Sequence, residues 1–68
     1  MKPRTDHKQA AEIAARVIRR GGQQGAHWGS QIKPAMERAG LVPSTFAIWN
    51  LKNAGRIKRI SRGIYRAI

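Results

Sequence analysis

The chain has 68 residues, with 14 lysines and arginines against three acids and a formal net charge of +11 at pH 7. This length makes a single domain that buries only about 60% of the surface exposed in the unfolded chain, so its core is small. The absence of cysteine excludes disulfides and thiolate zinc sites. No apolar run approaches the roughly 20 residues of a membrane span or resembles a signal peptide. We therefore expect a cytoplasmic protein without membrane contact.

The N-terminal residues 1–5, MKPRT, are basic and contain a proline that opposes helix formation, so we expect a flexible basic arm. A first helix is expected to begin at Asp6, whose side chain can cap the free amides ahead, and to end at Arg20. Two glycines follow and stop it. The apolar stripe that faces the core consists of Ala10, Ile13, Ala14, Val17 and Ile18.

A small strand and a second helix are expected next. His27-Trp28 is too short to be an element of its own, and we expect it to be the minor strand of a sheet. Ser30 is the expected N-cap of a second helix that ends at Gly40. Pro34 lacks an amide hydrogen, so the regular helix can also begin there. Its core residues are expected to be Ile32, Ala35, Met36 and Ala39.

A third helix is expected over residues 43–54, and it carries apolar residues on two faces. Ala47, Ile48 and Leu51 lie on one face, and Phe46 and Trp49 lie nearly opposite. The first face continues into Ile57 of the following segment, so we assign it to the core. We expect the remaining residues to face solvent or a ligand: Thr45, Phe46, Trp49, Asn50 and Asn53.

The last segment, GRIKRISRGIYRAI, contains two β-prone runs with five cations and no acid. Isoleucines that alternate with basic residues predict a hairpin with one packed face and one positive face. Gly63 can supply the positive φ that the turn needs, which leaves Arg62 projecting from the tip. The residues expected to pack in the sheet are Ile57, Ile60, Ile64 and Tyr65.

The charge is unevenly distributed along the chain. Residues 1–37 carry seven cations and all three acids, whereas residues 38–68 carry seven cations and no acid. A basic surface of this kind attracts polyanions and gains binding free energy when counterions leave phosphate. We expect the C-terminal half to face nucleic acid. The alternative is the solvated surface of a generally basic protein.

Over residues 6–68, these elements and the stretch AMERAGLVPSTFAIWNLKNAGRIKRISRGIYRAI resemble the winged helix-turn-helix superfamily of DNA-binding domains. The most specific signals are the glycine-containing turn before Pro-Ser-Thr and the Arg-Gly-Ile-Tyr return strand. The resemblance implies a mainly α fold with a small antiparallel sheet, in the order helix, strand, helix, helix, strand, strand. It also implies that the third helix (43–54) enters the major groove and that the wing (56–68) touches the backbone or minor groove of double-stranded DNA.

Candidate contacts on the third helix have distinct chemistries. Ser44 and Thr45 lie at its start, where hydroxyls and free amides can hold a phosphate or act only as caps. Asn50 and Asn53 can pair with adenine, and Lys52 can donate to phosphate or guanine, unless they are simply exposed polar residues. Phe46 and Trp49 can contact thymine methyls or sugars, or else a protein partner.

Candidate contacts outside the third helix are all cations. In the wing they are Lys58, Arg59, Arg62 and Arg66. Arg62 at the tip is the best placed to enter a narrow minor groove. The alternative is that some of the wing cations discourage edge-to-edge strand pairing. In the arm, Lys2 and Arg4 can lie in an adjacent minor groove.

Metal, cofactor and catalytic sites are not expected. His7 and His27 have no carboxylate or thiolate at ligand spacing, no catalytic set is evident, and the glycine-rich segment 21–25 lacks the ending of a phosphate loop. We expect a DNA-binding protein that is not an enzyme and acts as a transcriptional regulator or a DNA-organising protein. Its chain ends at the wing without a further helix for dimerisation or effector sensing, which favours a constitutive role.

Two alternatives to DNA binding remain at this point. One is a protein-interaction module that docks a partner, or weakly self-associates, through Phe46 and Trp49 within a larger nucleoprotein complex. The weaker one is binding to a membrane surface through the basic first helix, whose apolar stripe lacks bulky anchors.

Overall fold

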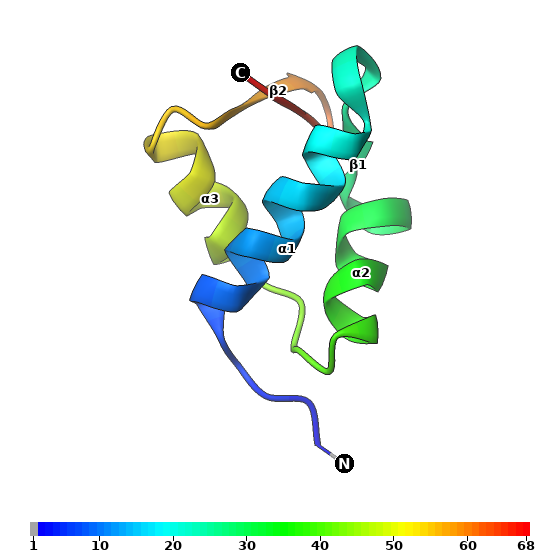
Figure 1. Cartoon of the computed structure of the whole chain (residues 1–68), viewed down its shortest axis with the longest axis vertical. Helices are drawn as coiled ribbons and strands as arrows, with labels where there is room; N and C mark the ends of the chain where they lie inside the picture. Colours follow the sequence, from blue (N-terminus) through cyan, green and yellow to red (C-terminus); the bar gives the residue numbers. More distant parts are fainter. Residues whose placement is uncertain (1) are drawn as a thin grey trace.

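The computed structural model describes residues 2–68 and contains three helices and a three-stranded antiparallel sheet. The elements are α1 (His7–Arg20), the short 3₁₀ turn η1 (Gly22–Gln24), β1 (Ala26–His27), the π-helical turn η2 (Trp28–Ile32), α2 (Lys33–Arg38), α3 (Thr45–Asn53), β2 (Ile57–Ser61) and β3 (Ile64–Ala67). The strand order in the sheet is β1-β3-β2. This is a winged helix topology, so the expected fold class is confirmed. Figure 1 shows α1 between α2 and α3, with the sheet and the N-terminal segment at opposite ends.

The first helix forms as its local signals predict. The Asp6 carboxylate accepts a hydrogen bond from the Gln9 amide at 3.0 Å and so satisfies one of the free donors of the first turn. Arg19 and Arg20 occupy the last turn, where they complement the negative end of the helix dipole. The residues of α1 that are fully buried are Ala10, Ala14 and Ile18.

The start of the second helix differs from the expectation. Ser30 is not the N-cap, because the Nδ1 atom of His27 accepts hydrogen bonds from the amides of Gly29 (3.1 Å) and Ser30 (3.3 Å). The chain then makes a π-helical turn before α2, in which Pro34 occupies the first turn. Proline has no amide hydrogen to donate to the carbonyl four residues back, so a regular α-helix that ran through this point would lose a backbone hydrogen bond.

The minor strand lies one residue earlier than expected. It comprises Ala26 and His27, which face Tyr65 and Ile64 of β3, whereas Trp28 already begins the π-helical turn. The amide of Trp28 still donates to the carbonyl of Gly63 at 2.8 Å. The wing is therefore fixed to the segment that leads into α2.

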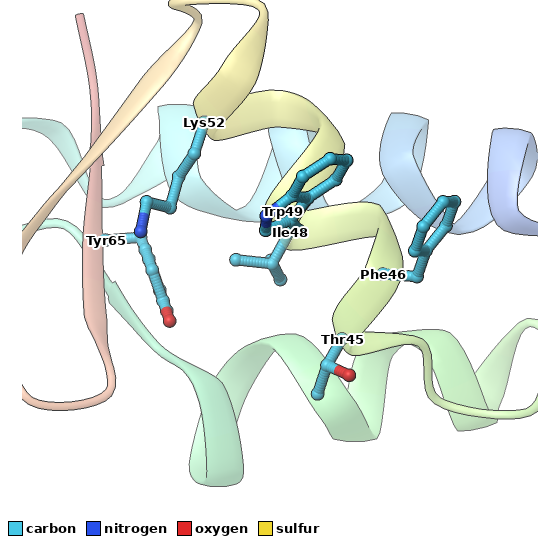
Figure 2. A pocket seen from close by; sticks show the side chains of 6 residues that line it. All are labelled: Thr45, Phe46, Ile48, Trp49, Lys52 and Tyr65. Carbon is cyan, nitrogen blue, oxygen red and sulfur yellow. The ribbon is translucent and has the colours of Figure 1, made fainter.

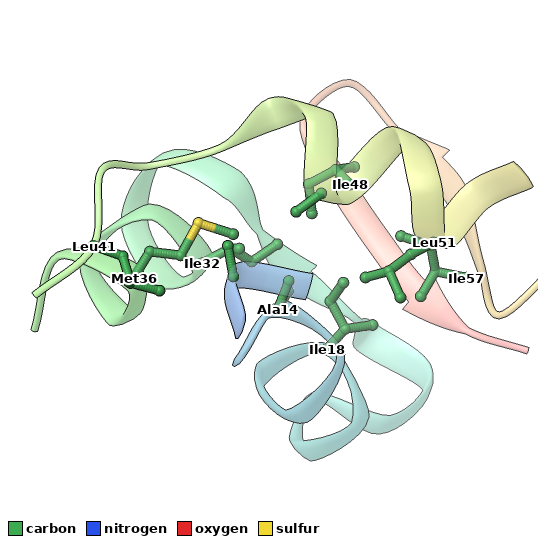
Figure 3. Packing of buried hydrophobic residues seen from close by; sticks show 11 residues of the cluster. Ala14, Ile18, Ile32, Met36, Leu41, Ile48, Leu51 and Ile57 are labelled. Atoms are coloured by element: carbon green, nitrogen blue, oxygen red, sulfur yellow. The ribbon is translucent and has the colours of Figure 1, made fainter. Parts of the chain in front are cut away.

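The core lies where the three helices and β2 meet. Its largest fully buried side chains are Ile18, Ile32, Met36 and Leu41. Ala47, Ile48 and Leu51 of α3 join this cluster together with Ile57 of β2, which confirms the predicted orientation of α3. Figure 3 shows Ile48, Leu51 and Ile57 pointing from their elements toward Ile18.

The wing hairpin contains an irregularity that changes one expected core residue. Arg59 faces Tyr65 and Ser61 faces Ile64, so the register shifts by one residue between them and Ile60 is the additional residue of a bulge. Ile60 is 43% exposed, and its expected place in the sheet core is wrong. Ile57 is buried as expected, and Tyr65 is half-buried against the core.

The N-terminal segment differs from the expected flexible arm at Arg4. Its amide donates to the carbonyl of Gly40 at 3.1 Å, and its carbonyl accepts from the amide of Val42 at 2.9 Å. These bonds make a parallel bridge between Arg4 and Leu41 in the turn before α3. Arg4 is thus part of the folded domain, whereas Met1, the first residue of the expected arm, lies outside the described residues.

Candidate nucleic-acid interface

The outward face of α3 is organised around one line of side chains. A rotation of about 100° per residue places Thr45, Trp49 and Asn53 one above the other, pointing away from the buried face of the helix. We call these three residues the outer stripe, and all three are exposed. Phe46 flanks the stripe on the side of α1, and Lys52 flanks it on the side of the wing.

A hollow of about 480 Å³ lies beside the outer stripe, between α3 and β3. Figure 2 shows its lining side chains: Thr45, Phe46, Ile48, Trp49, Lys52 and Tyr65. The rings of Phe46 and Trp49 stack with centroids 5.8 Å apart and planes inclined by 20°. They are 51% and 55% exposed, so each ring keeps about half of its surface available to a ligand.

Ser44 is not available to a ligand. It is only 6% exposed, and its hydroxyl oxygen accepts a hydrogen bond from the Ala47 amide at 3.2 Å, as an N-cap does. The same hydroxyl bonds to Nδ1 of His7 at 2.7 Å. Ser44 therefore fixes the start of α3, and the adjacent Thr45 is the hydroxyl that faces outward.

His7 is a residue of this site that sequence reasoning missed. Its ring bonds to Ser44 and packs edge-on against Phe46, with ring centroids 5.1 Å apart and an interplanar angle of 62°. The bond between His7 and Ser44 joins residues 37 positions apart, so no local sequence pattern predicts it. His7 joins the start of α1 to the start of α3 and contacts the ring of Phe46.

Asn50 and Asn53 occupy different environments. Asn53 belongs to the outer stripe, one helical turn beyond Trp49. Asn50 lies nearer α1 and lines a cleft together with Lys8 and Glu12. The two asparagines, for which the sequence predicts the same role, thus lie on different sides of α3. Only Asn53 lies at the centre of the outward face.

The wing divides its cations between the two faces of the sheet. Directly opposite residues of an antiparallel pair share a face. Arg59 is opposite Tyr65, which lines the hollow, so Arg59 leaves the sheet on the side of α3. Its Nε atom donates to the carbonyl of Ser61 at 3.3 Å, toward the tip.

The other wing cations lie elsewhere. Lys58 is opposite Arg66, and this pair shares the face of the sheet turned away from α3. Arg62 occupies the tip beside Gly63, whose φ of 74° confirms the expected positive angle. Arg59 is therefore the wing cation that the structure places on the side of α3, and Arg62 is exposed at the tip.

Lys2 and Arg4 lie beside the turn that joins α2 to α3. The bridge between Arg4 and the turn before α3 holds this segment beside the start of that helix. The Arg4 guanidinium donates to the Gln9 side chain at 2.7 Å, whereas Lys2 is exposed. Lys2 lines a hollow together with Glu37, Ala39 and Gly40 at the end of α2, whereas no acidic residue follows Glu37 in the chain.

Within residues 2–68, no helix is both long and apolar enough to cross a membrane, and no three potential metal ligands lie together. Comparisons of the chain with protein-family models, with curated proteins and with solved structures find no match.

Proposed function

We propose that this protein binds double-stranded DNA, with α3 in the major groove and the wing on the adjacent backbone or minor groove. The observation that supports this most is the outward face of α3, which carries aromatic and amide groups beside the cations Lys52 and Arg59. The major groove is about 12 Å wide and admits one α-helix. A helix of nine residues such as α3 spans about 14 Å at 1.5 Å per residue.

The contacts in this proposal have separate roles. Asn53 faces the base edges and Lys52 faces either guanine or phosphate, while Arg59 and Arg62 hold the backbone beside the wing. Lys2 reaches the backbone beside the turn that joins α2 to α3.

On this basis we place the chain among winged helix-turn-helix proteins and propose a role as a transcriptional regulator or as a DNA-organising, nucleoid-associated protein. Both roles require the same surface. They differ in whether affinity depends strongly on sequence.

The test is the salt dependence of duplex binding, measured by fluorescence anisotropy of a labelled duplex of about two helical turns. About five phosphate contacts predict a slope of log K against log salt near −4.5, at roughly −0.9 per contact. The matched control is the single strand of the same sequence, which should bind more weakly. A slope near zero would contradict the proposal.

A second candidate is a module that docks a protein partner, and the stacked, half-exposed rings of Phe46 and Trp49 favour it. Chemical-shift mapping separates the two candidates. DNA binding predicts shifts on residues 45–53 and 58–62 when duplex is added. If those amides stay unperturbed at duplex concentrations well above the protein's, the docking function becomes the better account.

A further inference from the structure

Trp49 occupies the centre of the outer stripe, where a helix in the major groove presents side chains to base edges. An indole ring has one donor and a large apolar surface, so it reads hydrogen-bonding patterns poorly. The apolar group that unmodified B-DNA displays in this groove is the C5-methyl of thymine. The chemistry of the central side chain therefore points to a methyl group on a pyrimidine.

The aromatic pair is held in place before any ligand arrives. Trp49 stacks on Phe46, Phe46 packs against His7, and His7 is bonded to Ser44 at the start of α3. A rigid apolar surface loses little conformational entropy when it covers a small group. The adjoining hollow has space for a methyl group and the neighbouring edge of the base.

We propose that the Phe46–Trp49 pair binds the C5-methyl group of pyrimidines in the major groove and so makes the protein selective for methylated pyrimidines over unmethylated ones. The ligand class is C5-methylpyrimidine, present in duplexes as thymine or as 5-methylcytosine. This inference rests on the proposed binding of double-stranded DNA.

Asn53 adds a second element to the selectivity. It lies four residues beyond Trp49 on the same stripe, about 6 Å along the helix at 1.5 Å per residue. This distance corresponds to roughly two base steps of 3.4 Å. Because an Asn amide pairs bidentately with adenine, the two side chains together select a C5-methylpyrimidine and an adenine about two base steps apart.

The experiment replaces thymine by deoxyuridine in an alternating A·T duplex, which removes the methyl groups and leaves charge and base pairing unchanged. Covering one methyl group contributes about fourfold in affinity, so we expect the unmodified duplex to bind about fourfold more tightly for each methyl covered. A second pair of probes, an alternating G·C duplex with cytosine or with 5-methylcytosine, distinguishes the two sources of the methyl group.

Two variants assign the effect to the aromatic pair. In Trp49→Ala the affinities for thymine and deoxyuridine duplexes should become equal. In the matched control Asn50→Ala, which alters the same helix on the side of α1, the ratio should persist. Circular dichroism and the fluorescence of Trp28 verify that each variant is folded.

The possible failures are distinguishable. Equal binding of thymine and deoxyuridine duplexes by the unaltered protein overturns the methyl selectivity, and the proposed DNA function stands if the salt slope is still steep. Tighter binding to the single strand than to the duplex also overturns it, because the rings would then stack on unpaired bases. Absence of binding to every duplex overturns both proposals.

Discussion

The helices α1 and α3 use their outward faces in opposite ways. The exposed side of α1 mixes cations with Glu12, as is usual for a solvated surface. The exposed side of α3 has no acid and presents two large aromatic rings. Both helices bury one face in the same core, so the difference does not arise from packing. It indicates that α1 supports the fold, while the outer side of α3 is free to serve a ligand.

The largest expected effect is a loss of stability in a variant of α1, which tests whether α1 supports the fold without contacting the ligand. Ile18→Ala removes a fully buried side chain and should lower the free energy of unfolding by about 3 kcal/mol, through lost burial and the cavity left behind. Urea denaturation followed by tryptophan fluorescence measures it. Binding of duplex per folded molecule should not change, because Ile18 lies inside the core.

A milder variant keeps this test valid if Ile18→Ala does not fold. Ile18→Val should cost about 1 kcal/mol and leave duplex affinity unchanged. A clear loss of affinity in this folded variant would contradict the separation between the supporting helix and the outward face of α3.

An intermediate loss of stability is expected when either of two glycines in turns is replaced by alanine. Gly63 in the wing turn and Gly40 in the turn after α2 have φ values of 74° and 79°. Replacing either by alanine forces a left-handed backbone on a residue with a Cβ, which costs about 1–2 kcal/mol. A Cβ at Gly40 meets open space, whereas one at Gly63 lies 3.4 Å from Nε2 of His27.

We therefore expect similar losses of stability in Gly63→Ala and Gly40→Ala, since a contact of 3.4 Å is ordinary van der Waals contact. Only Gly63→Ala should also weaken duplex binding, because it disturbs the position of Arg62. Thermal melting and anisotropy titration measure the two quantities. Equal affinities of the two variants would remove the wing tip from the interface.

The smallest expected effect is a change in the affinity for duplex when one of two arginines in the β2–β3 pair is removed. Arg59→Ala should weaken duplex binding and make the salt slope less steep by about 0.9, because it removes one phosphate contact. Arg66→Ala should leave the slope unchanged, since Arg66 lies on the face of the sheet turned away from α3. The same anisotropy titrations at several salt concentrations test both, and a reversed order would place the duplex on the other face of the sheet.

Sequence reasoning predicted the features that depend on local signals. The capping Asp6 and the apolar spacing of α1 predicted the first helix, and the continuity of the α3 core face with Ile57 predicted the orientation of α3, whereas the fold class was implied by the resemblance to winged helix-turn-helix domains. Of the two expected starts of the second helix, Ser30 is wrong because His27 caps a π-helical turn there, whereas Pro34 lies one residue after the observed start at Lys33.

Features of the candidate site that depend on tertiary contacts were not predictable in the same way. Ser44 is buried and bonds to His7 across 37 positions, and the difference between Asn50 and Asn53 follows from the position of α1. The exposure of Ile60 follows from a register shift that alternation of apolar and basic residues does not reveal. In each case the environment of the residue depends on a partner that is distant in the chain or on the pairing of the backbone.

The bulge at Ile60 has a consequence for how the protein behaves in concentrated solution. β2 is an edge strand of the sheet, and a straight edge would offer an unpaired row of amides and carbonyls to the next molecule. The extra residue breaks that row in its second half, while Lys58 and Arg59 add like charges that repel a second copy. An isoleucine can therefore remain exposed on this strand without turning the edge into a template for intermolecular sheets.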